Sequence, residues 1–188
     1  MRDVRFNEPM VVQACADFEV AIGLLRVTRS SGSTPNDAII AKCSQAVEKL
    51  LKAFLMCRFP AEAIKIAKSS HNVVLHVRRV SEPASETMLR MLANIANPQR
   101  SDLIQLLQWV PANNLGAPNT EYPFELEGSV ETACQYFSIG QVVRSIQATW
   151  LLMEHLGDVQ NAFPDKATLA LRRTIEVLRQ QLPVGFSR

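Results

Sequence analysis

Histidine is the side chain whose ordinary pKa lies closest to neutral pH, so the three histidines are the first candidates for catalysis or metal binding. His71 and His76 are five residues apart, which turns them about 140° from one another on a helix. They therefore cannot share a metal ion in the way that an i, i+4 pair does. A capping or packing role is the better interpretation of His71. We expect neither a bound metal nor a cofactor.

The cysteines lie far apart, in stretches with a helical apolar pattern, and no pair has the close spacing of a zinc or redox motif. Free cysteine behaves as a small hydrophobe, so buried free thiols are expected at Cys15, Cys43, Cys57 and Cys134. No glycine-rich phosphate loop is present, since the glycines are scattered and none precedes Lys-Ser or Lys-Thr. The sequence therefore argues against thiol chemistry and against P-loop nucleotide hydrolysis.

Acidic residues cluster once, at Glu125, Glu127 and Glu131, without an aspartate or histidine beside them. We interpret them as a solvated face rather than a carboxylate site. Positive charge lies in the middle of the chain, because residues 40–100 hold ten Lys or Arg against four Asp or Glu, a net charge of +6. A patch that contacts phosphates is one interpretation, and solubility is the other, for Lys65, Lys68, Arg78, Arg79 and Arg90.

Apolar residues recur at three- and four-residue steps along most of the chain, which predicts an all-α protein. The expected helices span residues 10–29, 34–58, 60–69, 70–77, 83–96, 98–110, 129–156 and 165–182. No segment alternates convincingly as a strand, and the segment 111–128, with three prolines and two glycines, is expected to be a long loop. These elements predict an antiparallel helical bundle that forms a single domain over residues 1–188, with a core that a partner chain could complete.

The helix expected at 34–58 has the clearest pattern. Ile39, Cys43, Leu50 and Phe54 belong to its apolar stripe, whereas the lysines at 42, 49 and 52 are expected to lie mostly away from the stripe. No apolar run along the chain approaches the roughly 20 residues that cross a bilayer, and the first nine residues do not resemble a signal peptide. We therefore expect a cytoplasmic protein without a membrane partner.

Three short segments have a pattern in common with a known family. In the segment 43–53, Gln45-Ala46, Glu48 and Lys52-Ala53 follow one another along the expected second helix. Ser70-His71-Asn72-Val73 starts the next helix, and Tyr122-Pro123 precedes a long one. In this order and at these spacings the segments resemble the HEPN family, named for nucleotide-binding domains of higher eukaryotes and prokaryotes. The resemblance spans residues 43–123, less than half of the chain.

The departures from the family pattern concern catalysis. Glu121 stands where the family has an arginine before the Tyr-Pro pair, which puts any anion-binding role of that position in doubt. Ribonucleases of the family have an Arg followed after four to six residues by a His, which supplies a positive charge for phosphate and a group for proton transfer. None of the three histidines in this chain has an arginine at that spacing.

The resemblance therefore implies a non-catalytic HEPN-like module, forming a homodimer, that binds a partner protein or a nucleotide. It also implies an association with a nucleotidyltransferase or with a toxin and antitoxin system. The residues that we nominate for ligand or nucleic-acid binding are Arg78, Arg79, Tyr122, Arg144 and His155. One alternative is a ribonuclease whose site is assembled across a dimer, with Arg78, Arg144 and His155 as its active residues. A second alternative is an interaction protein unrelated to HEPN.

Overall fold

The computed structural model describes residues 7–27, 35–69, 73–109, 120, 124–127 and 129–182, and helices make up nearly all of their regular structure. The expected all-α class is confirmed to that extent. The helices are α1 (Asn7–Leu24), α2 (Asn36–Arg58), the 3-10 turn η1 (Pro60–Glu62), α3 (Ala63–Ala67), α4 (Val73–Val80), α5 (Glu82–Ala93), α6 (Gln99–Gln108), α7 (Ala133–Tyr136), α8 (Ile139–Asp158) and α9 (Asp165–Arg179). No helix in this part of the chain is long and apolar enough to cross a membrane.

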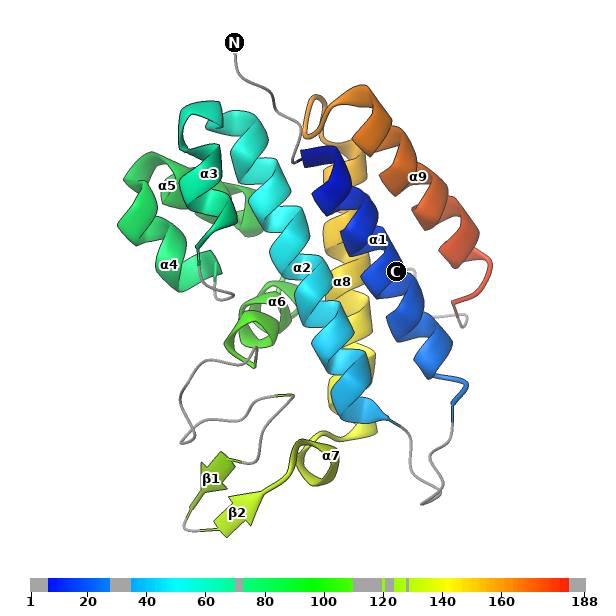
Figure 1. The fold of residues 1–188 in the computed structure, drawn as a ribbon. Helices are drawn as coiled ribbons and strands as arrows, with labels where there is room; N and C mark the ends of the chain where they lie inside the picture. The colour runs from blue at the N-terminus through cyan, green and yellow to red at the C-terminus, as the bar shows by residue number, and fades with distance from the viewer. Residues whose placement is uncertain are drawn as a thin grey trace.

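Four long helices form the body of the molecule. α1, α2, α8 and α9 run side by side, with α1 antiparallel to α2 and α8 antiparallel to α9 (Figure 1). α3, α4 and α5 lie beside the C-terminal half of α2, and α6 packs against both α2 and α8 (Figure 1). The shared contact with α2 and α8 places α6 next to the start of α8, where the candidate site lies.

α2 is the central helix of the core. It packs against α1, α5, α6 and α8, and 14 of its 23 residues are buried, more than the single apolar stripe of a surface helix requires. Phe18 from α1 and Trp150 from α8 are both fully buried and belong to the same hydrophobic cluster as the apolar residues of α2. The helices are therefore held together by one continuous core.

The expected loop at 111–128 and the absence of strands need correction. Residues 124–126 form strand β1 (Phe124–Leu126), which pairs with the antiparallel strand β2 (Ser129–Glu131) in the register Phe124 to Glu131. Glu127, in the turn between the two strands, has a φ of 51°, a left-handed conformation that suits a tight turn. The two strands are only three residues long, too short for a visible apolar alternation. Residues 111–119, 121–123 and 128 lie outside the described residues.

The helix expected at 129–156 is also wrong at its start. Residues 129–131 belong to β2, α7 follows, and the chain is extended at Phe137 and Ser138 before α8 begins. Ser138 caps α8, because its hydroxyl accepts a hydrogen bond from the backbone N–H of Gln141 while the Gln141 side chain accepts one from the Ser138 N–H. Apolar periodicity alone does not detect a helix start that is defined by a reciprocal cap of this kind.

The charged residues of α2 differ from expectation as well. Lys52 is only 4% exposed and donates to Glu48 Oε1 at 2.7 Å and to the Ser69 carbonyl oxygen at 2.7 Å. Lys42 and Lys49 are partly exposed, but both form ion pairs with the buried Asp17 of α1. Position on the helix is thus a poor guide to exposure where a neighbouring helix supplies a carboxylate. Residues 34 and 70, where two of the expected helices start, lie outside the described residues.

Candidate functional site

A cavity of about 420 Å³ lies between α6, α7 and the N-terminal part of α8. Its volume falls within the range of roughly 300 to 1,000 Å³ that is usual for small-molecule sites. Its walls combine aromatic rings, amide and hydroxyl groups and one pair of opposite charges. The lining residues are Pro98, Asp102, Gln105, Trp109, Tyr136, Gln141, Arg144 and Ser145.

Two helices position the polar side chains of this cavity. Asp102, Gln105 and Trp109 recur at steps of three and four residues, which places them on one face of α6. Gln141, Arg144 and Ser145 likewise share a face of α8, and the cap at Ser138 fixes where that helix begins. The α6 and α8 faces meet because both helices pack on α2.

Aromatic packing holds the far wall. The Trp109 and Phe137 rings meet edge to face with centroids 5.2 Å apart, and Tyr136 and Phe137 do so at 5.1 Å. The Asn36 side chain of α2 donates to the Phe137 carbonyl oxygen at 2.8 Å, and the backbone N–H of Thr120 donates to the Trp109 carbonyl oxygen at 3.2 Å. These contacts fix Trp109 and Tyr136 at the edge of the cavity.

The charged pair gives the cavity both signs of charge. Burial raises the pKa of the Asp102 carboxyl above its usual range, and the neighbouring Arg144 guanidinium opposes that shift only in part. The two groups are 3.8 Å apart, and the Arg144 side chain is 58% exposed while that of Asp102 is 23% exposed. Such a long, exposed contact is weak, so Arg144 is available to a ligand.

The nominated residues of the sequence are only partly brought together. Arg144 lines the cavity, whereas Arg78 and Arg79 are exposed on α4 and do not line it, and Tyr122 lies outside the described residues. His155 is half-buried on α8, and its Nε2 atom is buried without a hydrogen-bond partner among the described residues. Arg144 and His155 are eleven residues apart on one helix, a separation of about 16 Å along its axis at 1.5 Å per residue.

Asp102, Trp109 and Tyr136 were not nominated from the sequence. Their only signal was the shared face of Asp102 and Trp109 on the helix expected at 98–110. That face also fits a solvated helix surface, and nothing in the sequence indicates that it meets the start of α8. The contact between α6 and α8 is set by tertiary packing.

The thiols are not candidates for catalysis. Burial raises the pKa of the Cys43 thiol to about 12 and those of Cys15 and Cys57 to about 11, so all three are protonated at neutral pH. The expected buried free thiol is confirmed for Cys15 and Cys43, whereas Cys57 is half-buried. The side chain of Cys134 is outside the described part of the structure. Where side chains are described, no group of three or more His, Cys, Asp or Glu is placed to hold a metal ion.

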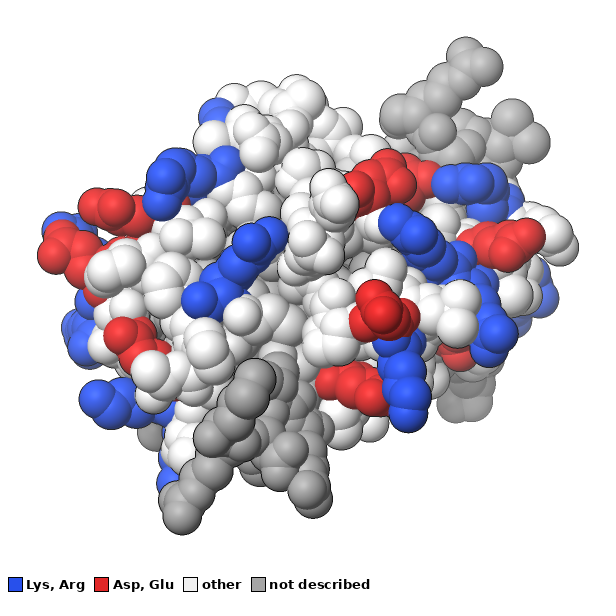
Figure 2. Space-filling model, turned by 90° about the horizontal axis from the view of Figure 1, so that it is seen from above, with Lys and Arg blue, Asp and Glu red and all other residues white. Residues whose placement is uncertain are grey.

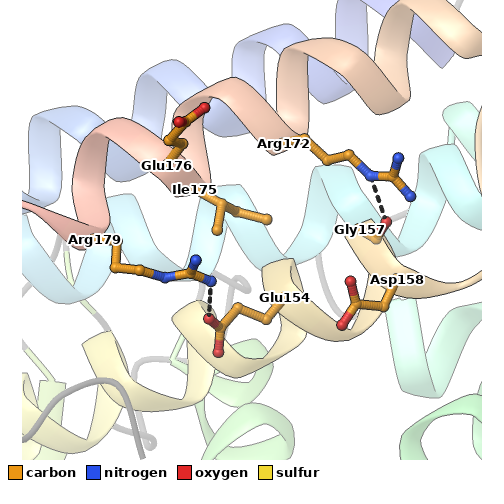
Figure 3. Close-up of a pocket in the computed structure, with 7 residues that line it drawn as sticks. All are labelled: Glu154, Gly157, Asp158, Arg172, Ile175, Glu176 and Arg179. Atoms are coloured by element: carbon orange, nitrogen blue, oxygen red, sulfur yellow. Dashed lines mark hydrogen bonds and ion pairs between the residues drawn. The ribbon is translucent and has the colours of Figure 1, made fainter.

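A second groove, of about 320 Å³, separates α8 from α9 (Figure 3). Its arginines are already engaged: Arg172 Nε donates to the Gly157 carbonyl oxygen at 3.0 Å, and Arg179 Nη2 donates to Glu154 Oε1 at 2.9 Å (Figure 3). Gly157 also lies close to α9, since a Cβ atom there would be 3.1 Å from Ile175 Cδ1. These contacts join the C-terminal end of α8 to α9, and the groove is better explained as an inter-helix seam than as a ligand site.

Charge on the surface does not single out one extended basic field on the face that Figure 2 shows. Lys and Arg side chains are interspersed with Asp and Glu along both sides of that face, around an uncharged area (Figure 2).

Comparison of the chain with models of protein families, with curated proteins and with solved structures gives no match. The cavity between α6 and α8 is therefore judged on its own chemistry.

Proposed function

We propose that the protein is a non-catalytic, HEPN-like helical module that binds a nucleotide in the cavity between α6 and α8. The observation that carries the proposal is that Arg144 and Asp102 line the same cavity as Trp109 and Tyr136. A nucleotide offers a phosphate, a set of hydroxyl and amino groups, and a flat ring. The cavity has a complementary group for each of these.

Each side chain has a role in this arrangement. Arg144 is half-exposed and weakly paired, so its guanidinium can donate charge-assisted hydrogen bonds to a phosphate. The Asp102 carboxyl can accept from a ribose hydroxyl or from a base amino group. Tyr136 is half-buried and offers ring surface to the base, beside Trp109, which is only 8% exposed. Arg144 and His155 lie about three turns apart on α8, which favours binding over phosphate-bond cleavage.

Titration with AMP tests the site, with tryptophan fluorescence as the readout. Trp109 lines the cavity whereas Trp150 is fully buried in the core, so we expect the signal to disappear in Trp109→Phe. Loss of a charge-assisted contact of about 1.5 to 3 kcal/mol should weaken binding of AMP to Arg144→Gln by about 10- to 150-fold. Arg173→Gln removes an exposed arginine of α9 and is the matched control. Equal affinity in Arg144→Gln and Arg173→Gln would contradict the proposal.

The proposed module is a homodimer, and α1 supplies a surface for it. Val12 and Val20 are 48% and 47% exposed, and Ala16 lies between them at four-residue steps on the same face. An antiparallel pairing of two α1 helices centred on Ala16 brings Val12 opposite the partner's Val20, and Gln13 opposite the partner's Glu19. Each contact therefore occurs twice, once from each protomer, as a two-fold interface requires.

Light scattering tests the dimer. We expect a mass of twice 21.0 kDa for the wild type and of 21.0 kDa for Val12→Glu with Val20→Glu, which places four carboxylates in the interface. Leu169→Glu changes an exposed apolar residue of α9 and serves as the control. A monomeric wild type at all concentrations would remove the dimer from the proposal but leave nucleotide binding to be decided by the AMP titration. A nucleotidyltransferase partner, or a toxin and antitoxin setting, is proposed from the family resemblance.

A further inference from the structure

We propose that a separate cavity, between the C-terminal ends of α2 and α5, binds an organic anion: a carboxylate, sulfate or phosphate that is joined to an apolar group. This cavity is wide open to solvent and has a volume of about 790 Å³. It is lined by Phe54, Arg58, Phe59, Thr87, Arg90, Met91, Ala93 and Asn94. The inference does not depend on the proposed function, because the two cavities share no lining residue.

The floor of the cavity is apolar and well packed. Phe54 and Met91 are only 4% and 6% exposed, and Phe59 is half-buried beside them. The Arg58 guanidinium lies 5.5 Å from the centroid of the Phe54 ring, within the distance at which the ring face attracts a cation. This stacking holds a planar donor at the edge of an apolar surface, an arrangement suited to an anion that has an apolar part.

The two arginines of the cavity have no acidic partner among the described residues. Both are exposed, the described lining residues include no carboxylate, and neither Arg58 nor Arg90 forms an ion pair with any described residue. Glu86 lies one turn before Arg90 on α5 but does not form an ion pair with it. Two cations that share a cavity without a counter-ion provide a binding site for a negatively charged group.

The C-terminal ends of the two helices carry partial negative charge, which opposes the positive charge of the arginines, so the two contributions have to be compared. A helix C-terminus carries a partial charge of about −0.5, and two of them together amount to about −1. The two arginines contribute +2, so the cavity keeps a net charge of about +1. Arg58 and Arg90 each stand in the last turn of a helix, where a basic residue also stabilises the helix end. Helix capping accounts for one arginine at each end but not for the shared apolar floor.

Polar groups complete the site on α5. Thr87, Arg90, Met91 and Asn94 recur at steps of three, one and three residues, which places them along one face of the helix and its C-cap. The Thr87 hydroxyl and the Asn94 amide can each donate a hydrogen bond to an anion oxygen. The cavity thus offers neutral donors beside the two guanidinium groups, and apolar contacts beneath them.

Phenyl phosphate is a suitable probe, because it joins a phosphate to one aromatic ring. We expect its addition to 15N-labelled protein to shift the amide signals of Thr87 and Asn94. Inorganic phosphate and phenol carry the two halves of the probe, and each should bind at least ten times more weakly than phenyl phosphate.

Variants decide whether the arginines are responsible. We expect Arg58→Gln and Arg90→Gln each to weaken binding of phenyl phosphate about tenfold or more, and Arg58→Lys, which keeps the charge but loses the planar group, to fall between Arg58→Gln and wild type. Lys166→Gln with Arg173→Gln removes two exposed charges from α9 and should leave the affinity unchanged. The inference is overturned if phenyl phosphate binds the Arg58→Gln, Arg90→Gln protein as tightly as this control. Binding that is absent at millimolar concentrations overturns it equally.

Discussion

Lys52 links α2 to the segment at the end of α3 from a buried position. Its ammonium group donates to the Glu48 carboxylate and to the Ser69 carbonyl oxygen, each at 2.7 Å, and to the Ala67 carbonyl oxygen at 3.4 Å. The Ala67 carbonyl belongs to the last residue of α3 and the Ser69 carbonyl lies two residues further on, so Lys52 holds the end of α3 against α2. Glu48 and Lys52 are also residues of the segment that resembles the HEPN family. In this fold they serve packing between helices.

Loss of the Lys52 ammonium should destabilise the protein strongly. Lys52→Ala removes the cation of a buried ion pair, and removing one partner of such a pair costs about 3 to 5 kcal/mol. Lys65→Ala, on the exposed face of α3, should change the free energy of unfolding by no more than about 0.5 kcal/mol. Chemical denaturation measures both. In the double variant Glu48→Gln, Lys52→Met the loss should be smaller than for Lys52→Ala, because both charges of the pair are removed together. Equal losses would contradict the role of the pair.

Asp102 makes the free energy of unfolding depend on pH, and the burial of its carboxyl determines the direction of that dependence. Because the pKa of Asp102 is raised in the folded protein, the folded state binds a proton more readily than the unfolded state. The free energy of unfolding therefore falls as pH rises from the ordinary value of 3.8 through the raised pKa. We expect Asp102→Asn to be more stable than wild type at pH 7, with a smaller gain at pH 4.

The control for this expectation is Asp158→Asn, since Asp158 is exposed at the end of α8. It controls for the loss of one negative charge at the surface. Denaturant titrations of the three proteins at the two pH values give the comparison. A gain in Asp102→Asn that is the same at pH 4 and pH 7 would show that burial does not raise the pKa of this carboxyl.

At the scale of elements, the Ser138 cap determines where α8 begins. Apolar residues continue at helical steps from 130 to 156, so periodicity predicts one long helix across this segment. The structure instead places a strand and the short helix α7 before Ser138, and only then α8. This break turns Tyr136 toward Trp109 and Arg144. The aromatic wall of the candidate site depends on it.

We expect Ser138→Ala to lower the free energy of unfolding by about 1 kcal/mol, the usual cost of losing an N-cap side chain. Gln141→Ala should cost less, because it removes only the return hydrogen bond to the Ser138 N–H. Ser138→Asn supplies another capping side chain and should restore most of the loss. Thermal denaturation of the three variants is the measurement. If Ser138→Asn is no more stable than Ser138→Ala, the cap does not fix this boundary.

Elements formed by interactions between residues close in sequence were predictable, whereas those formed by pairing or tertiary packing were not. α2 and α9 were located well because their apolar stripes repeat within a single helix. The hairpin of β1 and β2 was missed because its three-residue strands pair with each other and show no alternation of their own. The candidate site was missed for a similar reason, since Asp102 and Arg144 lie 42 positions apart and meet only through packing on α2.

At the scale of the whole molecule, the proposed dimer would bring the α1 surfaces of two protomers together. The α1 surface lies on the bundle formed by α1, α2, α8 and α9, whereas the proposed nucleotide site lies at the junction of α6, α7 and α8 (Figure 1). Pairing through α1 therefore leaves that cavity open in both protomers. The arrangement suits a module with one site per chain and does not require a site shared between chains.

This arrangement leads us to expect that the purified protein does not cleave RNA above background. Cleavage of the ribonuclease type needs a donor for the phosphate charge and a group of near-neutral pKa to move the proton, each worth orders of magnitude in rate. Arg144 and His155 are about 16 Å apart along α8, at 1.5 Å per residue, and the Nε2 atom of His155 is buried. Labelled single-stranded RNA incubated with wild type, Arg144→Ala and His155→Ala gives the measurement. Cleavage by wild type that both substitutions abolish would favour a ribonuclease assembled across the dimer, whereas cleavage that persists in both variants would point to a contaminating nuclease.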